Sequence, residues 1–344
     1  SVFVVNGTPV NKYNFSGTIG EKRISAQVID KFKITIDEKI ILTSDNIEYH
    51  IVELVKLLKN LSKAKSASSM KDSSKKIELK ARNSSLYFRP ENRIMADKLE
   101  ASIVNGKTSL RLEHDSGKAV FVAEDGKFSF EGENLDATFM EALLANSIFS
   151  GGTLSFTGNG DRKNFDARFM VQNTLLENYS VMNNVLAFLN TIPALITFSV
   201  PDYNTKGMFV DSSILDLTYV GNGFRVNAFD VNASELSIRG AGKANISEDT
   251  IDLKLNLLTE GRKDLSKIPL IGYILVGDEK VPSIKLEVTG KLSDSDPDIQ
   301  NSAFEEIVTL PFDIGLRVLS LPFRWMKDAF LDEDPNTQGN SKNK

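Results

Sequence analysis

Apolar and polar residues alternate with a period of two along much of the chain. Residues 251–257 read Ile-Asp-Leu-Lys-Leu-Asn-Leu, and residues 284–292 repeat this alternation. In an extended strand, such alternation places the apolar side chains on one face and the polar side chains on the other. We therefore predict a mainly β protein whose strands run as an antiparallel meander. Dipeptides typical of tight hairpin turns separate the strand-like segments: Asn105-Gly106, Asp125-Gly126, Asn159-Gly160 and Asn222-Gly223.

A few segments instead repeat apolar residues every three or four positions, which is helical spacing. They lie at about 49–61, 137–148 and 180–193. The apolar faces that we expect for the first two comprise Val52, Val55, Leu58 and Leu61, and Met140, Leu143, Leu144 and Ile148. Residues 62–76 contain six Ser and five Lys, which predicts a flexible loop. A patch that binds anionic lipid or nucleic acid is the alternative interpretation of this loop.

The predicted helices are too few to cover the predicted strands. The patterns indicate on the order of fifteen strands but only three or four helices, so most apolar strand faces lack a helix to pack against. Either the sheet closes on itself as a self-packed core, or it leaves an apolar groove. The clean separation of apolar and polar rows favours an elongated, curled antiparallel sheet that forms a groove for acyl chains. The residues predicted to line it are Leu215, Leu217, Tyr219, Phe224, Val226, Leu236, Ile238, Ile251, Leu253, Leu255, Leu257, Ile284, Leu286 and Val288.

Residues 301–331 predict an amphipathic helical segment, followed by a polar tail at 332–344 that we expect to be disordered. Polar positions from Asp313 to Lys327 recur every three or four residues, and the rest of the surface is apolar and includes the only Trp of the chain. Such a segment suits a membrane interface or a membrane-protein partner. A helix docked on the end of the sheet is the alternative. The predicted contact residues are Phe312, Leu316, Leu319, Phe323, Trp325, Met326 and Phe330.

Composition removes most enzyme chemistry from consideration. The 344 residues include no Cys and two His, His50 and His114, which excludes disulfides, thiolate nucleophiles and Cys-based metal sites. No nucleotide-binding, hydrolase or metalloprotease motif occurs. We therefore predict a protein without catalytic residues, metal or cofactor. The net charge of −5 argues against nucleic acid as a partner. The chain opens at Ser1 without a signal-like segment, which we interpret as a fragment of a longer protein.

The order of segments from about residue 150 to 300 resembles that of a known family. The segments that carry the likeness are Gly151–Gly158, the predicted helix Val181–Pro193, Lys206–Phe209, Gly240–Gly242, Ile268–Leu275 and Val288–Asp294. They resemble the C-terminal region of the AsmA-like family of bacterial envelope proteins, of the AsmA, YhdP and TamB type. Residues 1–149 match only in their β character.

The resemblance implies a curled sheet around an apolar channel, without a catalytic motif. It also implies a periplasmic body that an N-terminal helix, absent from this chain, anchors to the inner membrane. The expected function is non-enzymatic transfer of phospholipid or another acyl lipid between the inner and outer membranes, in support of outer-membrane integrity. A scaffold domain with a closed core and a membrane-protein partner is the alternative. We expect a β-rich groove segment at 1–149 and the AsmA-like region at 150–300, before the C-terminal segment.

Overall fold

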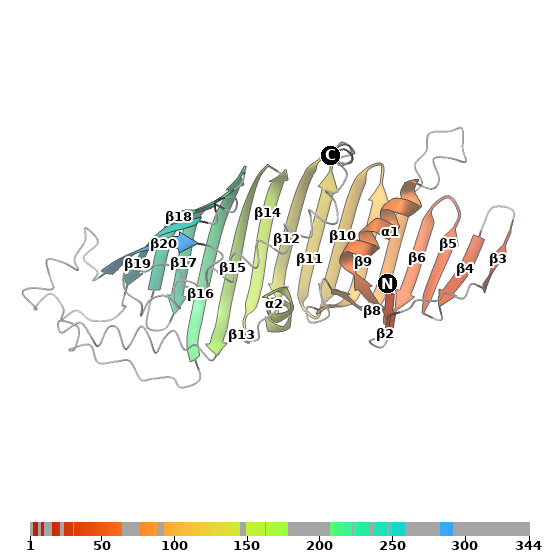
Figure 1. Cartoon of the computed structure of the whole chain (residues 1–344). Coiled ribbons are helices and arrows are strands. Elements are labelled where there is room, and N and C mark those ends of the chain that lie inside the picture. The colour runs from red at the N-terminus through yellow and green to blue at the C-terminus, as the bar shows by residue number, and fades with distance from the viewer. Residues whose placement is uncertain are drawn as a thin grey trace, which may run out of the picture. The chain divides into compact units, whose positions relative to one another are not determined.

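The computed structural model describes 20 strands and two helices, within two compact units (Figure 1). The described residues are 3–5, 8–9, 16–20, 24–29, 31–63, 76–87, 93–144, 149–161, 163–177, 207–221, 223–233, 237–245, 248, 250–258 and 283–291. The predicted helix at 180–193, most of the loop at 62–76, the C-terminal segment and the tail lie outside them. None of the described helices is both long and apolar enough to cross a membrane.

The first unit, which includes residues 1–125, is a mixed sheet with one helix. Its elements are β1 (Phe3–Val5), β2 (Thr8–Pro9), β3 (Ser16–Ile19), β4 (Ile24–Ile29), β5 (Phe32–Ile36), β6 (Ile40–Asp45), β7 (Glu48–His50), α1 (Ile51–Lys63), β8 (Ile77–Tyr87), β9 (Arg93–Val104), β10 (Lys107–His114) and β11 (Gly117–Glu124). The strands from β3 to β6 pair as an antiparallel meander, and those from β8 to β11 form a second one.

The two meanders of this unit meet in a parallel arrangement that the sequence pattern did not predict. Both β6 and β7 pair with β8 in parallel. A parallel pair cannot be joined by a tight turn and needs a crossover connection. The chain makes this connection through α1, which packs against β7, β8 and β9 (Figure 1). The sheet is therefore mixed, whereas the alternation predicted antiparallel pairing throughout.

The second unit, which includes residues 126–141 and 146–315, is an antiparallel sheet. Its elements are β12 (Lys127–Leu135), the part of α2 (Ala137–Leu144) up to Glu141, β13 (Phe149–Ser150), β14 (Thr153–Asp161), β15 (Asn164–Glu177), β16 (Gly207–Val220), β17 (Gly223–Ala233), β18 (Ser237–Asn245), β19 (Thr250–Leu258) and β20 (Ser283–Lys291). From β14 to β20, each strand pairs with the next one in sequence, as the alternation predicted.

Two of the four predicted hairpin turns are confirmed. Asn105-Gly106 and Asp125-Gly126 have positive φ at both positions, as a two-residue hairpin of the primed type requires. The prediction at Asn159-Gly160 was wrong, because both residues lie within β14. The chain turns later because the Asp161 carboxylate accepts hydrogen bonds from the backbone N–H groups of Lys163, at 2.7 Å, and Asn164, at 3.0 Å.

The fourth predicted turn begins one residue earlier than expected. Val220 pairs with Gly223, which is already the first residue of β17. Gly221 has a φ of 67° and supplies the left-handed conformation at the start of the turn. Glycine adopts this conformation without the steric cost that a side chain imposes.

The helices at about 49–61 and 137–148 are confirmed as α1 and α2. The Asp136 carboxylate caps α2 by accepting a hydrogen bond from the Phe139 backbone N–H at 3.0 Å. The buried face of α1 comprises Ile51, Leu54, Val55 and Leu58. The sequence pattern predicted Val55 and Leu58 in this face but not Ile51 and Leu54, because the predicted apolar repeat begins one residue late, at Val52.

Candidate functional site

One face of the second unit's sheet is apolar across consecutive strands. The pairing registers place Ala167, Leu217, Val226, Gly242 and Leu253 in a single row that crosses β15 to β19. The four side chains of this row are buried. A parallel row contains Phe169, Leu215, Phe229, Gly240 and Leu255 in the same strand order. We call this surface the apolar face.

Aromatic rings form a contiguous cluster at one end of the apolar face. The rings of Phe165 and Tyr219 are stacked with their centroids 5.1 Å apart, and the Tyr219 and Phe224 centroids are also 5.1 Å apart. The centroid of the Phe128 ring lies 5.7 Å from that of Phe165 and 6.3 Å from that of Phe130. Burial raises the pKa of the Tyr219 hydroxyl, so this residue stays neutral at physiological pH and adds no charge to the face.

Glycines make room for these large side chains. Gly158 lies opposite Phe130 on the neighbouring strand, and a Cβ atom at Gly158 would come within 2.2 Å of the Phe130 ring. Gly132 likewise lies opposite Phe156, and a Cβ atom at Gly132 would come within 2.5 Å of the Phe156 ring. A ring that lies over a glycine covers backbone that would otherwise be exposed. The face is therefore a continuous apolar layer in which small and large residues alternate.

Strand irregularities keep the apolar face continuous where the buried positions change from odd-numbered to even-numbered residues. In β15 the buried positions are odd-numbered up to Phe169 and even-numbered at Thr174 and Leu176. The change occurs around Asn173, which has a φ of 52° and lies between the pairs that Gln172 and Thr174 form with β16. One residue in the left-handed conformation interrupts the strict alternation of the strand, and the side chains that follow it return to the same face.

In β12 and β17 a bulge has the same effect. In β12, Asn134 has a φ of 52° and comes directly before Leu135, which is fully buried. In β17 the register shifts between Val226 and Phe229, with both residues buried. Each bulge therefore places the side chains before it and after it on the same apolar face.

The opposite face of the second unit's sheet is polar and internally hydrogen-bonded. The Arg168 guanidinium donates two hydrogen bonds to the Asp216 carboxylate, at 2.5 and 2.7 Å, and this pairing raises the pKa of Arg168. Beside it, the Thr218 hydroxyl donates to the Asp166 carboxylate at 2.7 Å and accepts from the Asn227 amide at 2.8 Å. Asp166, Arg168, Asp216 and Asn227 line a shallow hollow. This face is suited to contact with water.

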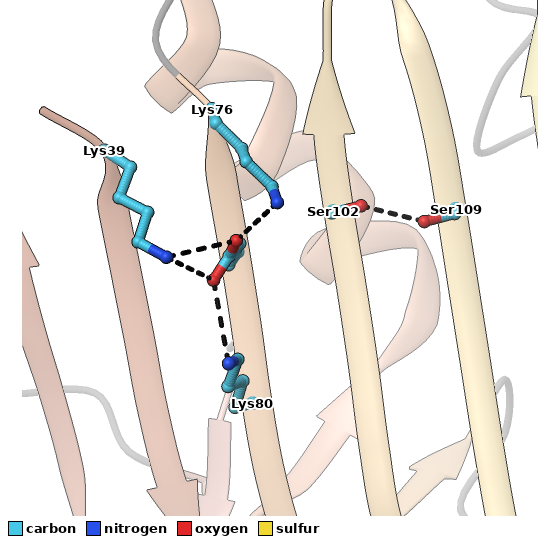
Figure 2. A network of polar contacts seen from close by, with 6 residues as sticks. Lys39, Lys76, Lys80, Ser102 and Ser109 are labelled. Carbon is cyan, nitrogen blue, oxygen red and sulfur yellow. Dashed lines mark hydrogen bonds and ion pairs between the residues drawn. The ribbon is translucent and has the colours of Figure 1, made fainter.

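The first unit separates its two sheet faces in the same way. Figure 2 shows Lys39, Lys76 and Lys80 converging on one carboxylate, which belongs to Glu78 and lies 3.3, 2.7 and 3.8 Å from the three ammonium groups. The hydrogen bond from Lys76 is the main cause that lowers the pKa of Glu78. The neighbouring residue Ile77 is buried on the other face, because successive side chains of a strand point in opposite directions.

The structure brings together all eight of the predicted lining residues whose side chains it describes. Leu215 is half-buried, and the buried ones are Leu217, Tyr219, Phe224, Val226, Ile238, Leu253 and Leu255. The backbone positions of Ile251, Leu257, Ile284, Leu286 and Val288 continue these rows in β19 and β20. Leu236 lies outside the described residues, as do the predicted contact residues from Phe312 to Phe330. That these residues contact lipid stays a prediction.

The predicted lining begins at Leu215, but the apolar face also includes residues that come earlier in the chain. Phe156, Phe165 and Phe169 belong to the aromatic cluster. The alternation of apolar and polar residues at 165–169 was the signal that could have identified them. Phe229 and Val231 were not predicted as lining residues either. Strict alternation does not place them on the same face as Phe224 and Val226, because a bulge lies between the two pairs.

Comparison with known proteins gives one informative result. A family model described as YhdP protein matches residues 70–297. The match covers well over half of the chain and includes every strand from β8 to β20. The comparisons with curated proteins and with solved structures gave no match.

Proposed function

The chain belongs to the YhdP protein family, an AsmA-like family of envelope proteins that are generally not enzymes, and from this membership we propose that it is a lipid-transfer module. In this proposal the apolar face shields phospholipid acyl chains on their way between the inner and outer membranes. The module acts in the periplasm and so supports outer-membrane integrity. The observation that carries the proposal is the row of buried apolar residues across β15 to β19.

The chemistry of the apolar face suits an acyl chain. Burial of each methylene group away from water contributes about 0.8 kcal/mol, without any need for a specific polar contact. Leu217, Val226, Leu253 and Leu255 offer only hydrocarbon atoms, and the charged partners Arg168 and Asp216 are on the opposite face. A lipid can therefore move from one part of the apolar face to the next with little change in free energy. Transport along a sheet requires such movement.

The test is whether lipid remains bound to the purified chain. We expect native mass spectrometry to find phospholipid with the wild-type protein and to find it lost from Leu255→Asp, because a carboxylate on the apolar face cannot be desolvated without a partner. Asn256→Asp is the matched control, since Asn256 is the exposed neighbour in the same strand. Both variants should retain the β signal in circular dichroism. Absence of lipid from the wild-type protein would overturn the proposal.

We also propose that the segment at 301–331 contacts a membrane or a membrane-protein partner. Its wide apolar arc, with Trp325 among cationic residues, supports this proposal. Flotation of the chain with liposomes of phosphatidylethanolamine and phosphatidylglycerol tests it. Phe323→Glu should reduce flotation, and Ser320→Glu, on the polar stripe, should leave it unchanged. Equal flotation of both variants would contradict a membrane contact through this arc.

A further inference from the structure

The shallow hollow on the polar face of the second unit has a lining of hydrogen-bonding side chains. Its residues come from four strands, β14 to β17, and its volume is about 320 Å³ (Figure 1). This volume is at the lower end of the range for small-molecule sites. The polar residues of the lining are Thr157, Asn159, Asp166, Arg168, Asp216 and Asn227.

Two rows of polar side chains border the hollow. The first row pairs Asn159 with Asp166, and the second pairs Thr157 with Arg168. Arg168 in turn pairs with Asp216 on β16. The row between them belongs to the apolar face, so its side chains point away from the hollow and its backbone forms the floor. The hollow is therefore a short polar trough that crosses the strands.

The bulge in β17 adds one more polar group to this trough. Consecutive residues of β16 pair with Val226 and Ala228, so Asn227 between them is the extra residue of the bulge. Asn227 is exposed, and its amide donates a hydrogen bond to the Thr218 hydroxyl at 2.8 Å. Bulges commonly re-aim a side chain beside a functional site. The bulge thus supplies the hollow with an amide that a regular strand would not place there.

Hydrogen bonds within the lining hold its side chains in position. The Asp216 carboxylate accepts two hydrogen bonds from the Arg168 guanidinium. On the other side of the hollow, Asn227 donates to Thr218, and Thr218 donates to Asp166. Side chains that are already ordered lose little rotamer freedom when a ligand binds. The lining is therefore preorganised.

The lining also keeps hydrogen-bonding capacity for a ligand. Within the described part of the chain, the side chains of Thr157 and Asn159 make no hydrogen bond, and Asp166 and Asn227 each use one of their two polar side-chain atoms. The groups that remain include both donors and acceptors. Two carboxylates and one guanidinium leave the hollow with one net negative charge, which opposes a phosphate group. The polar lining does not suit an acyl chain.

We propose that this hollow binds a sugar unit of a glycan through its hydroxyl groups. Each hydroxyl both donates and accepts hydrogen bonds, which matches a lining of mixed donors and acceptors. The Asp166 carboxylate and the Asn159 amide are cross-strand partners, and each offers two polar atoms to neighbouring hydroxyls of a sugar ring. The hollow is on the face opposite to the apolar face, so this inference is independent of lipid transfer.

Saturation-transfer difference NMR on the full chain tests the proposal with two sugar probes, chitotriose and maltotriose. We expect saturation transfer from the protein to the ring protons of at least one of them. Asn227→Ala and Thr157→Val should each weaken binding of that probe about three- to tenfold, as the loss of one hydrogen bond does. Asn232→Ala is the matched control, because Asn232 is an exposed residue of the same strand outside the hollow.

The sugar experiment has two outcomes that would overturn the proposal. One is the absence of transfer to both sugars. The other is binding that neither Asn227→Ala nor Thr157→Val weakens, because the sugar would then bind elsewhere. Both variants replace exposed side chains, and an unchanged β signal in circular dichroism shows that they are folded.

Ethanolamine is the third probe, because an ammonium group is the other ligand that the Asp166 carboxylate could attract. Asp166→Asn removes the charge but keeps an oxygen that accepts hydrogen bonds, so we expect sugar binding to persist in this variant. If ethanolamine binds to the wild type but not to Asp166→Asn, and neither sugar binds, the hollow is a cation site and the proposal is wrong.

Discussion

The ring of Phe130 on β12 lies directly over Gly158 on β14. The two residues are cross-strand partners, and a Cβ atom at Gly158 would come within 2.2 Å of Phe130 Cζ. We expect Gly158→Ala to lower the free energy of unfolding by about 1–3 kcal/mol, because the ring must leave its position. The measurement is the urea midpoint of the wild type and the variant. In a Phe130→Leu background the same substitution should cost much less, and an equal cost in both backgrounds would contradict this account.

The strand irregularity at Asn173 requires a residue that tolerates the left-handed conformation. Its φ of 52° should be available to Gly but strained for a β-branched side chain. We therefore expect Asn173→Val to destabilise the protein by about 1–2 kcal/mol. Asn173→Gly should be close to neutral in the same denaturation experiment. Similar losses for the two variants would show that the Asn side chain, and not its backbone conformation, stabilises this part of the strand.

The lysines around Glu78 should make stability depend on pH. Because the folded protein holds the pKa of Glu78 below its ordinary value of 4.5, the ionised carboxylate stabilises the fold above that pH. This stabilisation is lost as the pH falls through the lowered folded-state pKa. We expect Glu78→Gln to be less stable than the wild type by about 1 kcal/mol at pH 7, with the difference shrinking below pH 4.5.

Thermal denaturation across a pH series gives this difference directly. Glu124→Gln is the control, because the Glu124–Lys107 pair, at 3.3 Å, is about half exposed at both ends. Such a pair should contribute only a few tenths of a kcal/mol. A difference between wild type and Glu78→Gln that persists unchanged at low pH would exclude the carboxylate's charge as its cause.

The buried side of α1 should contribute strongly to the stability of the first unit. Leu54 is 1% exposed, and Leu54→Ala should cost about 2–5 kcal/mol through lost burial and the cavity that remains. Lys56→Ala, on the exposed side of the helix, should change stability by less than about 1 kcal/mol. Hydrogen exchange of the amides of β8 reports the effect locally. Unchanged protection of these amides in Leu54→Ala would show that α1 does not stabilise the strand.

The sequence predicted the β character and the sorting of apolar and polar faces, because both depend on the alternation of neighbouring residues. Leu253 and Leu255, with Lys254 between them, are buried and exposed as the pattern requires. The two hairpins at Asn105 and Asp125 were predictable for a similar reason, since their dipeptides determine the local backbone. The helices α1 and α2 were found from their spacing.

Three features could not be obtained from local patterns. The parallel pairing of β6 with β8 joins segments separated by a helix and a loop, and alternation contains no information about partners. The left-handed residue Asn173 places Leu176 on the same face as Phe169. Strict alternation predicts opposite faces for these two residues. The turn after β14 is displaced by hydrogen bonds to Asp161, which outweigh the preference of Asn159-Gly160 for a turn.

The connection through α1 also determines the order in which the first unit can assemble. The meander from β8 to β11 joins sequence neighbours, so each strand can add to the previous one with a short loop closure. Pairing of β6 with β8 must instead close the long segment that contains β7 and α1, which carries a larger entropic cost. The joining of the two meanders is thus the expected slow event in folding. Until it is complete, the apolar strand faces of the newly made chain are exposed and prone to aggregation.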